Sequence, residues 1–179
     1  SKPVYCREFT AALAARKLSE VEKIDERIIT VESLPEMVDV GAFRVGFLPV
    51  SHSIPEASSL VIDTPIGRVL HTGDFKIDET PVLGDPFNYD HLSEIKKPGI
   101  LASVCDSTNV FSGNHGRSEQ SIAENLLKLI SSQNGVVVGT TFASNIARLL
   151  TLARCARDSG RQILILGKAM HSMIATATA

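Results

Sequence analysis

The sequence predicts an α/β protein in which a strand meander is followed by strands that alternate with helices. Residues 42–72 contain three apolar runs separated by short turns, and the first of these runs alternates with the two-residue period of a half-buried strand. Residues 100–166 instead place short apolar runs between segments whose apolar side chains recur at helical spacing, which implies a parallel sheet. The character changes after Gly84-Asp85-Pro86, so we predict two parts, residues 1–85 and 86–179.

The composition is that of an ordinary folded protein, with 44% hydrophobic and 21% charged residues among 179. A formal net charge of −2 provides no global basic field, so composition neither supports nor excludes a nucleic-acid partner. The three cysteines, Cys6, Cys105 and Cys155, lack CxxC spacing and are predicted to be reduced. Because the sequence contains neither a targeting pattern nor an apolar run of about 18 residues, we expect a soluble, cytoplasmic protein without a membrane partner.

The first third of the chain is predicted to contain a helix followed by a strand. Apolar side chains recur at helical spacing in residues 9–15, and the run Ile28–Val31 is rich in the β-branched side chains that favour strands. Val4 and Tyr5 resemble the tail of a buried strand with almost no sequence ahead of it. We therefore expect that the chain is cut at its N-terminus, and also at Ala179, which falls inside a predicted helix.

The meander follows. From Ala42 to Pro49 the side chains alternate between two faces, as in a half-buried strand. The runs Ser59–Asp63 and Arg68–Thr72 are joined by Thr64-Pro65-Ile66-Gly67, whose Pro and Gly suit a tight hairpin. We predict three strands that run up, down and up.

The second part is predicted from its helical periods and short apolar runs. The predicted elements, in order, are a buried strand at Ile100–Cys105, a helix through residues 122–130 with Ser118 as N-cap, a strand at Gly135–Thr140, a helix capped by Ser144 and ended by Gly160, a strand at Ile163–Leu166, and a helix that begins near Lys168.

His52 and Asp74 are the first candidates for chemistry. His52 follows the first strand of the meander and Asp74 follows the third, so an up-down-up path returns both to the same edge of the sheet. Imidazole nitrogen and carboxylate oxygen are ligands of Zn²⁺ or Mn²⁺, and a carboxylate can bridge two ions that convert water into a hydroxide nucleophile. By spacing alone, a structural histidine and a simple Gly-Asp turn explain the same pattern.

Four ordered segments resemble ribonuclease J, and the resemblance extends from Pro3 to about Met170; they are Ser51–Glu56, His71–Lys76, Asp106–Asn109 and Thr141–Asn145. Ribonuclease J is a metallo-β-lactamase-fold nuclease with an inserted β-CASP domain. The resemblance implies that residues 1–85 are the C-terminal portion of a metallo-β-lactamase-like domain, and that residues 86–179 are the N-terminal portion of a β-CASP domain.

The resemblance also implies roles for three residues. His52 matches a metal ligand, and Asp74 matches the catalytic aspartate that bridges both metal ions. Asp106 is the second catalytic candidate, because it matches an acidic residue that helps orient the edge of the active site; capping of the following turn by a strand-end aspartate is the alternative. The implied cofactor is a pair of Zn²⁺ ions, with Mn²⁺ or Mg²⁺ as alternatives.

RNA is the implied partner. We predict that Ser107, Thr108, Ser144 and Asn145 contact its phosphates, the last two through the start of a helix, where simple capping by Ser144 is the competing explanation. His91, His115 and His171 receive no role.

The principal metal motif of the family, H-x-H-x-D-H, does not occur in this sequence. We therefore expect this fragment to bind metal weakly or not at all and to be inactive alone, whereas its parent, as a homodimer or homotetramer, hydrolyses RNA in maturation and decay. Two alternatives remain open: a non-catalytic α/β module that binds nucleic acid or phosphate, and a small-molecule hydrolase of the metallo-β-lactamase type.

Overall fold

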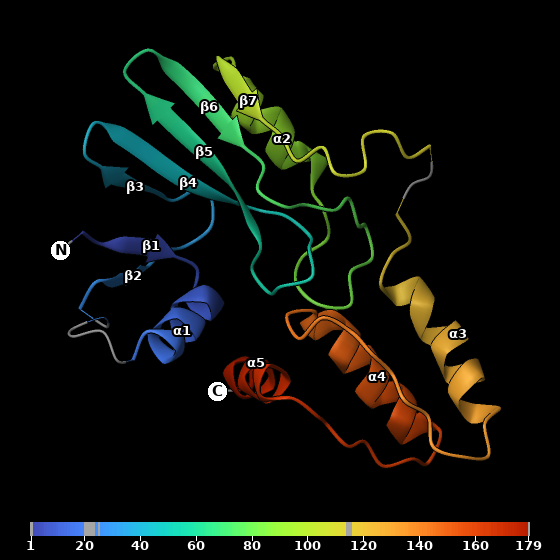
Figure 1. Cartoon of the computed structure of the whole chain (residues 1–179). Helices are drawn as coiled ribbons and strands as arrows, with labels where there is room; N and C mark the ends of the chain where they lie inside the picture. Colours follow the sequence, from blue (N-terminus) through green and yellow to red (C-terminus); the bar gives the residue numbers. More distant parts are fainter. Residues whose placement is uncertain (1, 20–23, 25, 114–115, 179) are drawn as a thin grey trace.

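The computed structural model describes residues 2–19, 24, 26–113 and 116–178 and has a mixed α/β architecture, as predicted (Figure 1). Its elements are β1 (Val4–Cys6), α1 (Glu8–Lys17), β2 (Ile28–Thr30), β3 (Met37–Val40), β4 (Phe43–Pro49), β5 (Ser58–Thr64), β6 (Gly67–His71), α2 (Tyr89–Lys96), β7 (Ala102–Val104), α3 (Gln120–Ser131), α4 (Ile146–Asp158) and α5 (Lys168–Ala177).

The predicted meander is confirmed. β4, β5 and β6 pair in antiparallel fashion, and the turn between β5 and β6 is closed by the Thr64 hydroxyl, which donates to the Gly67 carbonyl oxygen at 2.7 Å. The sheet has five strands in the order β3-β4-β5-β6-β7, with β3 added at one edge. β3 was not predicted, because its four residues are too few for a clear alternating pattern. β1 and β2 form a separate parallel pair.

The core of the sheet lies on the face that α2 covers. Leu48 of β4 and Val61 of β5 are almost completely buried and cluster with Ile95 of α2. Phe43, in contrast, lies at the exposed start of β4. Burial of these apolar side chains fixes which face of the meander is inside, and it attaches α2 to the sheet.

The predicted buried strand at Ile100–Cys105 is shorter and more exposed than expected. Only Ala102–Val104 form β7, and all three residues are exposed. β7 pairs in parallel with β6 at the edge of the five-stranded sheet, where a strand has only one neighbour. The elements directly after residue 85, α2 and β7, therefore pack on the sheet that precedes it; the division into two domains stays a prediction.

The predicted strands at Gly135–Thr140 and Ile163–Leu166 were wrong, since the structure has neither. Their apolar side chains are exposed, with Val136 at 92% and Leu164 at 80%. An apolar run becomes a strand only when another strand lies beside it to accept and donate hydrogen bonds. Among the described residues no such neighbour flanks either run, so the parallel sheet predicted for residues 86–179 does not form there.

The predicted helices of the second part are confirmed, with corrections at two N-caps, and α2 is an additional helix that was not predicted. Glu119, not Ser118, is the N-cap of α3, although the Ser118 hydroxyl accepts from the Gln120 N–H at 3.2 Å. Asn145, not Ser144, is the N-cap of α4, and its side-chain oxygen accepts from the Arg148 N–H at 2.9 Å. Gly160 ends α4 as predicted: with φ at 67°, it lets the chain turn so that its own N–H donates to the Arg157 carbonyl oxygen.

A second hydrophobic cluster joins helices that are far apart in the sequence. Phe9 of α1, Ile146 and Leu149 of α4, and Met173 of α5 are buried against one another. Figure 1 shows these helices on the side of the chain away from the β5–β6 hairpin. Within the described part of the chain, no helix has the length and apolar character needed to cross a membrane.

Candidate functional site

The loops that follow β4 and β6 lie side by side at one end of the five-stranded sheet. The Lys76 N–H donates to the Ser51 carbonyl oxygen at 2.7 Å, and the two residues form an isolated antiparallel bridge. His52 directly follows Ser51, and Asp74 lies two residues before Lys76. Both His52 and Asp74 are exposed. The up-down-up path thus returns both candidate loops to the same edge, as the topology predicted.

Asp106 is brought to the same edge because β7 runs parallel to β6. Its N–H donates to the Thr72 hydroxyl at 2.9 Å. This hydrogen bond joins the segment Asp106–Asn109 to the segment His71–Lys76. The Asp106 carboxylate accepts from the Thr108 N–H at 2.9 Å and from the Thr108 hydroxyl at 2.6 Å. These hydrogen bonds hold the pKa of Asp106 below its usual value, and the nearby His52 lowers the pKa further.

Two of the predicted phosphate contacts have local roles in this turn. Thr108 holds the carboxylate of Asp106, and the Ser107 carbonyl oxygen accepts from the Val110 N–H at 3.1 Å. Asp106 therefore caps a turn while also lying close enough to His52 for electrostatic interaction. Both explanations offered for Asp106 fit this geometry.

The backbone of the His52 loop is held by a residue that was not predicted. The Glu56 carboxylate accepts from the Phe9 N–H in the first turn of α1 at 2.6 Å, and it pairs with Arg7 at 3.2 Å. Glu56 itself has φ at 57°, an uncommon value for a residue with a side chain. The loop lines a hollow of about 160 Å³, which Arg7 and Glu56 also line.

Ser144 and Asn145 lie between Ala143 and Ile146, which belong to the same hydrophobic cluster as Ile54 of this loop. Ile54 and Ala143 both pack against the cluster of Phe9, Ile146, Leu149 and Met173, so the His52 loop and the start of α4 share one hydrophobic support. Ser144 is exposed and Asn145 is half-buried.

The remaining histidines in the described residues contact their own surroundings. The His71 ring accepts from the Gly73 N–H at 3.1 Å, and the His171 ring lies 3.0 Å from the Ile165 carbonyl oxygen. His115 lies outside the described residues.

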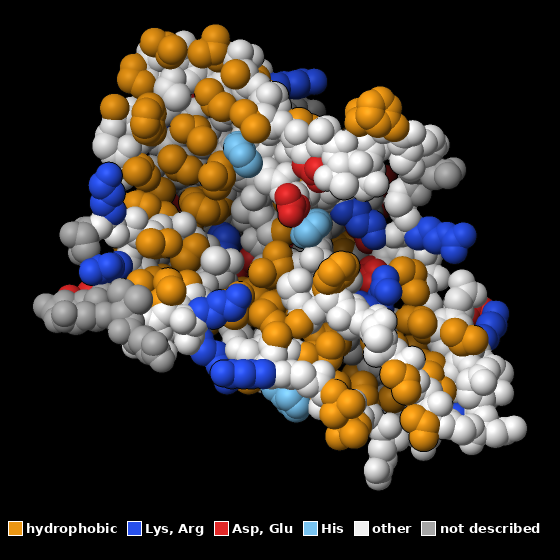
Figure 2. All heavy atoms as spheres, in the orientation of Figure 1, with side chains coloured by type: hydrophobic (Ala, Val, Ile, Leu, Met, Phe, Trp, Pro, Cys, Tyr) orange, Lys and Arg blue, Asp and Glu red, His pale blue; other side chains and the backbone are white. Residues whose placement is uncertain are grey.

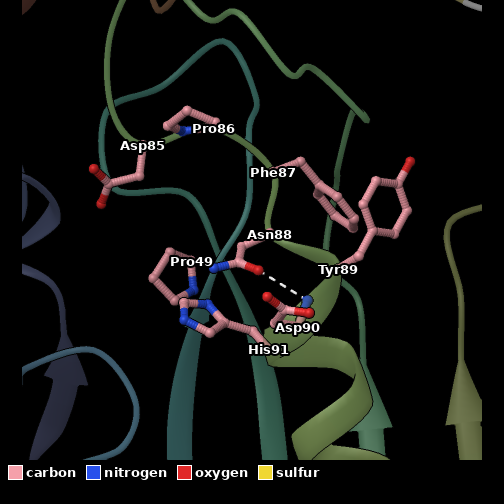
Figure 3. A pocket seen from close by; sticks show the side chains of 8 residues that line it. All are labelled: Pro49, Asp85, Pro86, Phe87, Asn88, Tyr89, Asp90 and His91. Carbon is pink, nitrogen blue, oxygen red and sulfur yellow. Dashed lines mark hydrogen bonds between the residues drawn. The ribbon is translucent and has the colours of Figure 1, made fainter.

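His91 lines a separate hollow of about 610 Å³ at the start of α2 (Figure 3). Pro49 lines this hollow and also the smaller one beside His52, and Phe87 packs edge-to-face on Tyr89 with ring centroids 5.1 Å apart. None of the predicted site residues lines the larger hollow.

The surface of this region is mixed in charge. Figure 2 shows His side chains near Asp or Glu side chains at the middle of one face, with Lys and Arg side chains beside them. Within the described ranges, no group of three or more His, Cys, Asp and Glu side chains is placed to hold a metal ion.

Fold and site together define an α/β chain in which His and Asp side chains of separate loops gather at one end of a mixed sheet. No family model matches the chain. It is 39% identical over 175 residues to "Ribonuclease J" of Sinorhizobium meliloti, covering 98% of this chain and 31% of that protein. It is 33% identical over 181 residues to "Ribonuclease J2" of Bacillus subtilis, covering 99% of this chain and 32% of that protein.

The chain thus spans about a third of the length of these curated relatives. "Ribonuclease J" of Synechocystis is also similar, with 35% identity over 175 residues, 97% of this chain and 27% of that protein. The resemblance to ribonuclease J predicted from four motifs is confirmed over nearly the whole chain.

A solved structure from Enterococcus faecalis, described as a protein of unknown function, has the same fold. It superposes with a TM-score of 0.64 at 18% identity, covering 97% of this chain and 42% of that one.

Proposed function

We propose that this chain forms part of a metal-dependent ribonuclease of the ribonuclease J type, which hydrolyses RNA phosphodiester bonds in RNA maturation and decay. The observation that supports this most is the meeting of three motif loops at one sheet end, with Lys76 bonded to Ser51 and Asp106 bonded to Thr72. Similarity to ribonucleases J supports the same function. These relatives give no support to a phosphate-binding module or to a small-molecule hydrolase.

The proposal includes the fold family and the domains. Residues 1–85 would be the C-terminal portion of a metallo-β-lactamase-like domain, and residues 86–179 would begin a β-CASP domain. α2 and β7 pack on the first sheet, so they would belong physically to the metallo-β-lactamase-like domain although they follow residue 85.

His52 and Asp74 would hold the metal. Their imidazole nitrogen and carboxylate oxygens are the donors that Zn²⁺ accepts, and Mn²⁺ or Mg²⁺ would suit the carboxylate as well. A bound pair of ions would supply a hydroxide nucleophile and stabilise charge on the phosphodiester. Two ligands do not complete a tetrahedral shell, so further ligands would come from other parts of the parent protein.

The other candidate residues would position RNA. Asp106 would orient the site edge through its bond to Thr72, and Ser107 and Thr108 would contact phosphate from the same turn. Ser144 and Asn145 would do so from the start of α4, where the helix dipole favours an anion. We include cytoplasmic location and assembly as a homodimer or homotetramer in this proposal.

A chimera tests the function directly. In it, this chain replaces the matched segment of the Sinorhizobium meliloti ribonuclease J. We expect the folded chimera to cleave 5′-monophosphorylated RNA, and we expect His52→Ala or Asp74→Ala to abolish cleavage, because each removes a metal ligand. Cleavage is followed on denaturing gels with end-labelled RNA.

Matched controls are His91→Ala and Asp90→Ala, which remove the same groups from α2, outside the four motif segments. Both should cleave RNA at the wild-type rate. A chimera that folds but leaves RNA intact, or a His52→Ala variant that still cleaves, would refute the assignment.

A further inference from the structure

Asp78 is a buried acidic residue for which neither the sequence motifs nor the proposed chemistry gives a role. It is 4% exposed, and it lies in the segment that leaves the Asp74 loop. Burying a charged carboxylate is costly unless its oxygens accept hydrogen bonds, so its partners indicate what it holds in place.

The partners of Asp78 come from several separate segments. Its carboxylate accepts from the Thr80 N–H at 3.0 Å and from the Glu119 N–H, at the start of α3, at 3.1 Å. The Lys76 ammonium lies 3.5 Å from the same carboxylate. The backbone oxygen of Asp78 accepts from the Ser51 hydroxyl at 3.4 Å.

From Asp78 the contacts continue to the start of α4. Glu119 pairs with Arg148 through two hydrogen bonds, at 2.5 and 3.0 Å, and its side chain is only 13% exposed. The Arg148 N–H donates to the Asn145 side chain. A continuous set of bonds thus joins the residue before His52, the segment after Asp74 and the N-cap of α4.

We infer that Asp78 is a positioning residue that fixes the His52 loop, the Asp74 loop and the start of α4 relative to one another. The inference rests on the proposed function, because these segments would contain the metal ligands and the phosphate contacts. A bidentate Arg–carboxylate pair has a fixed geometry, so the Glu119–Arg148 pair transmits the position of α3 to α4 with little freedom.

Amide hydrogen exchange of the chain itself tests the inference without any assay of activity. In Asp78→Asn the Glu119 N–H faces an amide group in place of a carboxylate, and we expect the Glu119 and Arg148 amides to exchange about 10-fold faster. Glu79→Gln is the matched control, since it makes the same change at the next residue, which is exposed. Amides of the central strand β5 should exchange at the wild-type rate in both variants.

Unchanged exchange at Arg148 would overturn the inference, because it would mean that Asp78 does not act on α4 through Glu119. An equal increase in the exchange of the β5 amides would also overturn it, because that indicates a general loss of stability. If Asp78→Asn does not fold, Glu119→Gln separates the steps. It should speed exchange at Arg148 while the Thr80 amide, which bonds to Asp78, stays protected. Loss of protection at both amides would contradict the proposed order of contacts.

The chimera adds a readout that a purely structural role would not change. Asp78→Asn should lower kcat by about 10- to 100-fold with little change in KM, as expected for misplaced reacting groups. Combining it with Glu119→Gln should cost no more than Asp78→Asn alone; additive losses would mean that the two residues act independently. If the wild-type chimera does not cleave RNA, the proposed function fails while the exchange experiment still decides the role of Asp78.

Discussion

Glu56 belongs to one of the four motif segments, but its role became clear only from its tertiary contacts. In the sequence it ends the segment Ser51–Glu56, and nothing there indicates a partner. In the structure it accepts from the Phe9 N–H and pairs with Arg7, so it anchors the His52 loop to α1. The signal that could have revealed it is an acidic side chain, which suits the positive end of a helix.

Asp63 and Arg68 form a pair whose effect on stability depends on pH. The hydrogen bond from Arg68, at 2.5 Å, lowers the pKa of Asp63 from its ordinary value, and the raised pKa of Arg68 agrees with the same contact. A lowered folded-state pKa means that the stabilisation is complete above the unfolded pKa of about 3.9, and is lost as pH falls through the folded value.

We therefore expect Asp63→Asn to lower the free energy of unfolding by about 1 kcal/mol at pH 7, a modest value because the pair is partly exposed. The difference from wild type should shrink once the pH falls below about 3.9. Urea unfolding at several pH values measures it. Asp39→Asn, which removes an exposed partner of Arg44, should have little effect at any pH; a difference for Asp63→Asn that grows in acid would contradict the assignment.

At the scale of elements, strands were predicted well where they pair locally and poorly where they need distant partners. The β5–β6 hairpin requires only a turn between neighbouring runs, and Thr64 to Gly67 supply it. The runs Gly135–Thr140 and Ile163–Leu166 have equally apolar sequences, but no strand lies beside them in the described part of the chain. Apolar periodicity indicates that a segment can pair, whereas pairing itself depends on the neighbour.

Two single substitutions at the start of α4 test which residue caps this helix. Asn145→Ala should destabilise the chain by about 1 kcal/mol, because it removes the acceptor of the Arg148 N–H. Ser144→Ala should change stability by less than about 0.5 kcal/mol, since Ser144 is exposed and is not the cap. Thermal or chemical denaturation of the two variants measures this; equal losses would mean that Ser144 shares the capping role.

At the scale of the whole molecule, the candidate site depends on contacts between distant segments. Ile54 places the His52 loop on the helix cluster of α1, α4 and α5, and Asp78 ties the Asp74 loop to α3. These contacts join the two parts that were predicted to divide near residue 85. The loops of one part are therefore positioned by the helices of the other.

Metal dependence can be measured separately on the chimera and on the chain alone. EDTA should stop RNA cleavage by the chimera, and added Zn²⁺ or Mn²⁺ should restore it. The chain alone should bind Zn²⁺ at least about 100-fold more weakly than the chimera, because His52 and Asp74 leave the coordination shell incomplete. Calorimetric titration compares the two; equal affinities would contradict the proposed ligand set.

The sequence by itself determined the meander, the helices α1, α3, α4 and α5, the α/β class and the resemblance to ribonuclease J. These features depend on local periodicity, turn residues such as Gly67 and Gly160, and ordered motifs, all of which are written in short stretches of sequence. Even the return of His52 and Asp74 to one edge followed from strand count alone. Local chemistry was sufficient in each case.

Only the tertiary structure decided which residues hold the site together. Glu56, Asp78 and Arg148 each have a partner 29 or more residues away: |i−j| is 49 for Glu56–Arg7, 41 for Asp78–Glu119 and 29 for Arg148–Glu119. No local pattern specifies such pairs, since a buried carboxylate is stabilised by whichever donors the folded chain brings to it. The positions of the candidate metal and RNA residues therefore depend on contacts that form only when the sheet and helices pack.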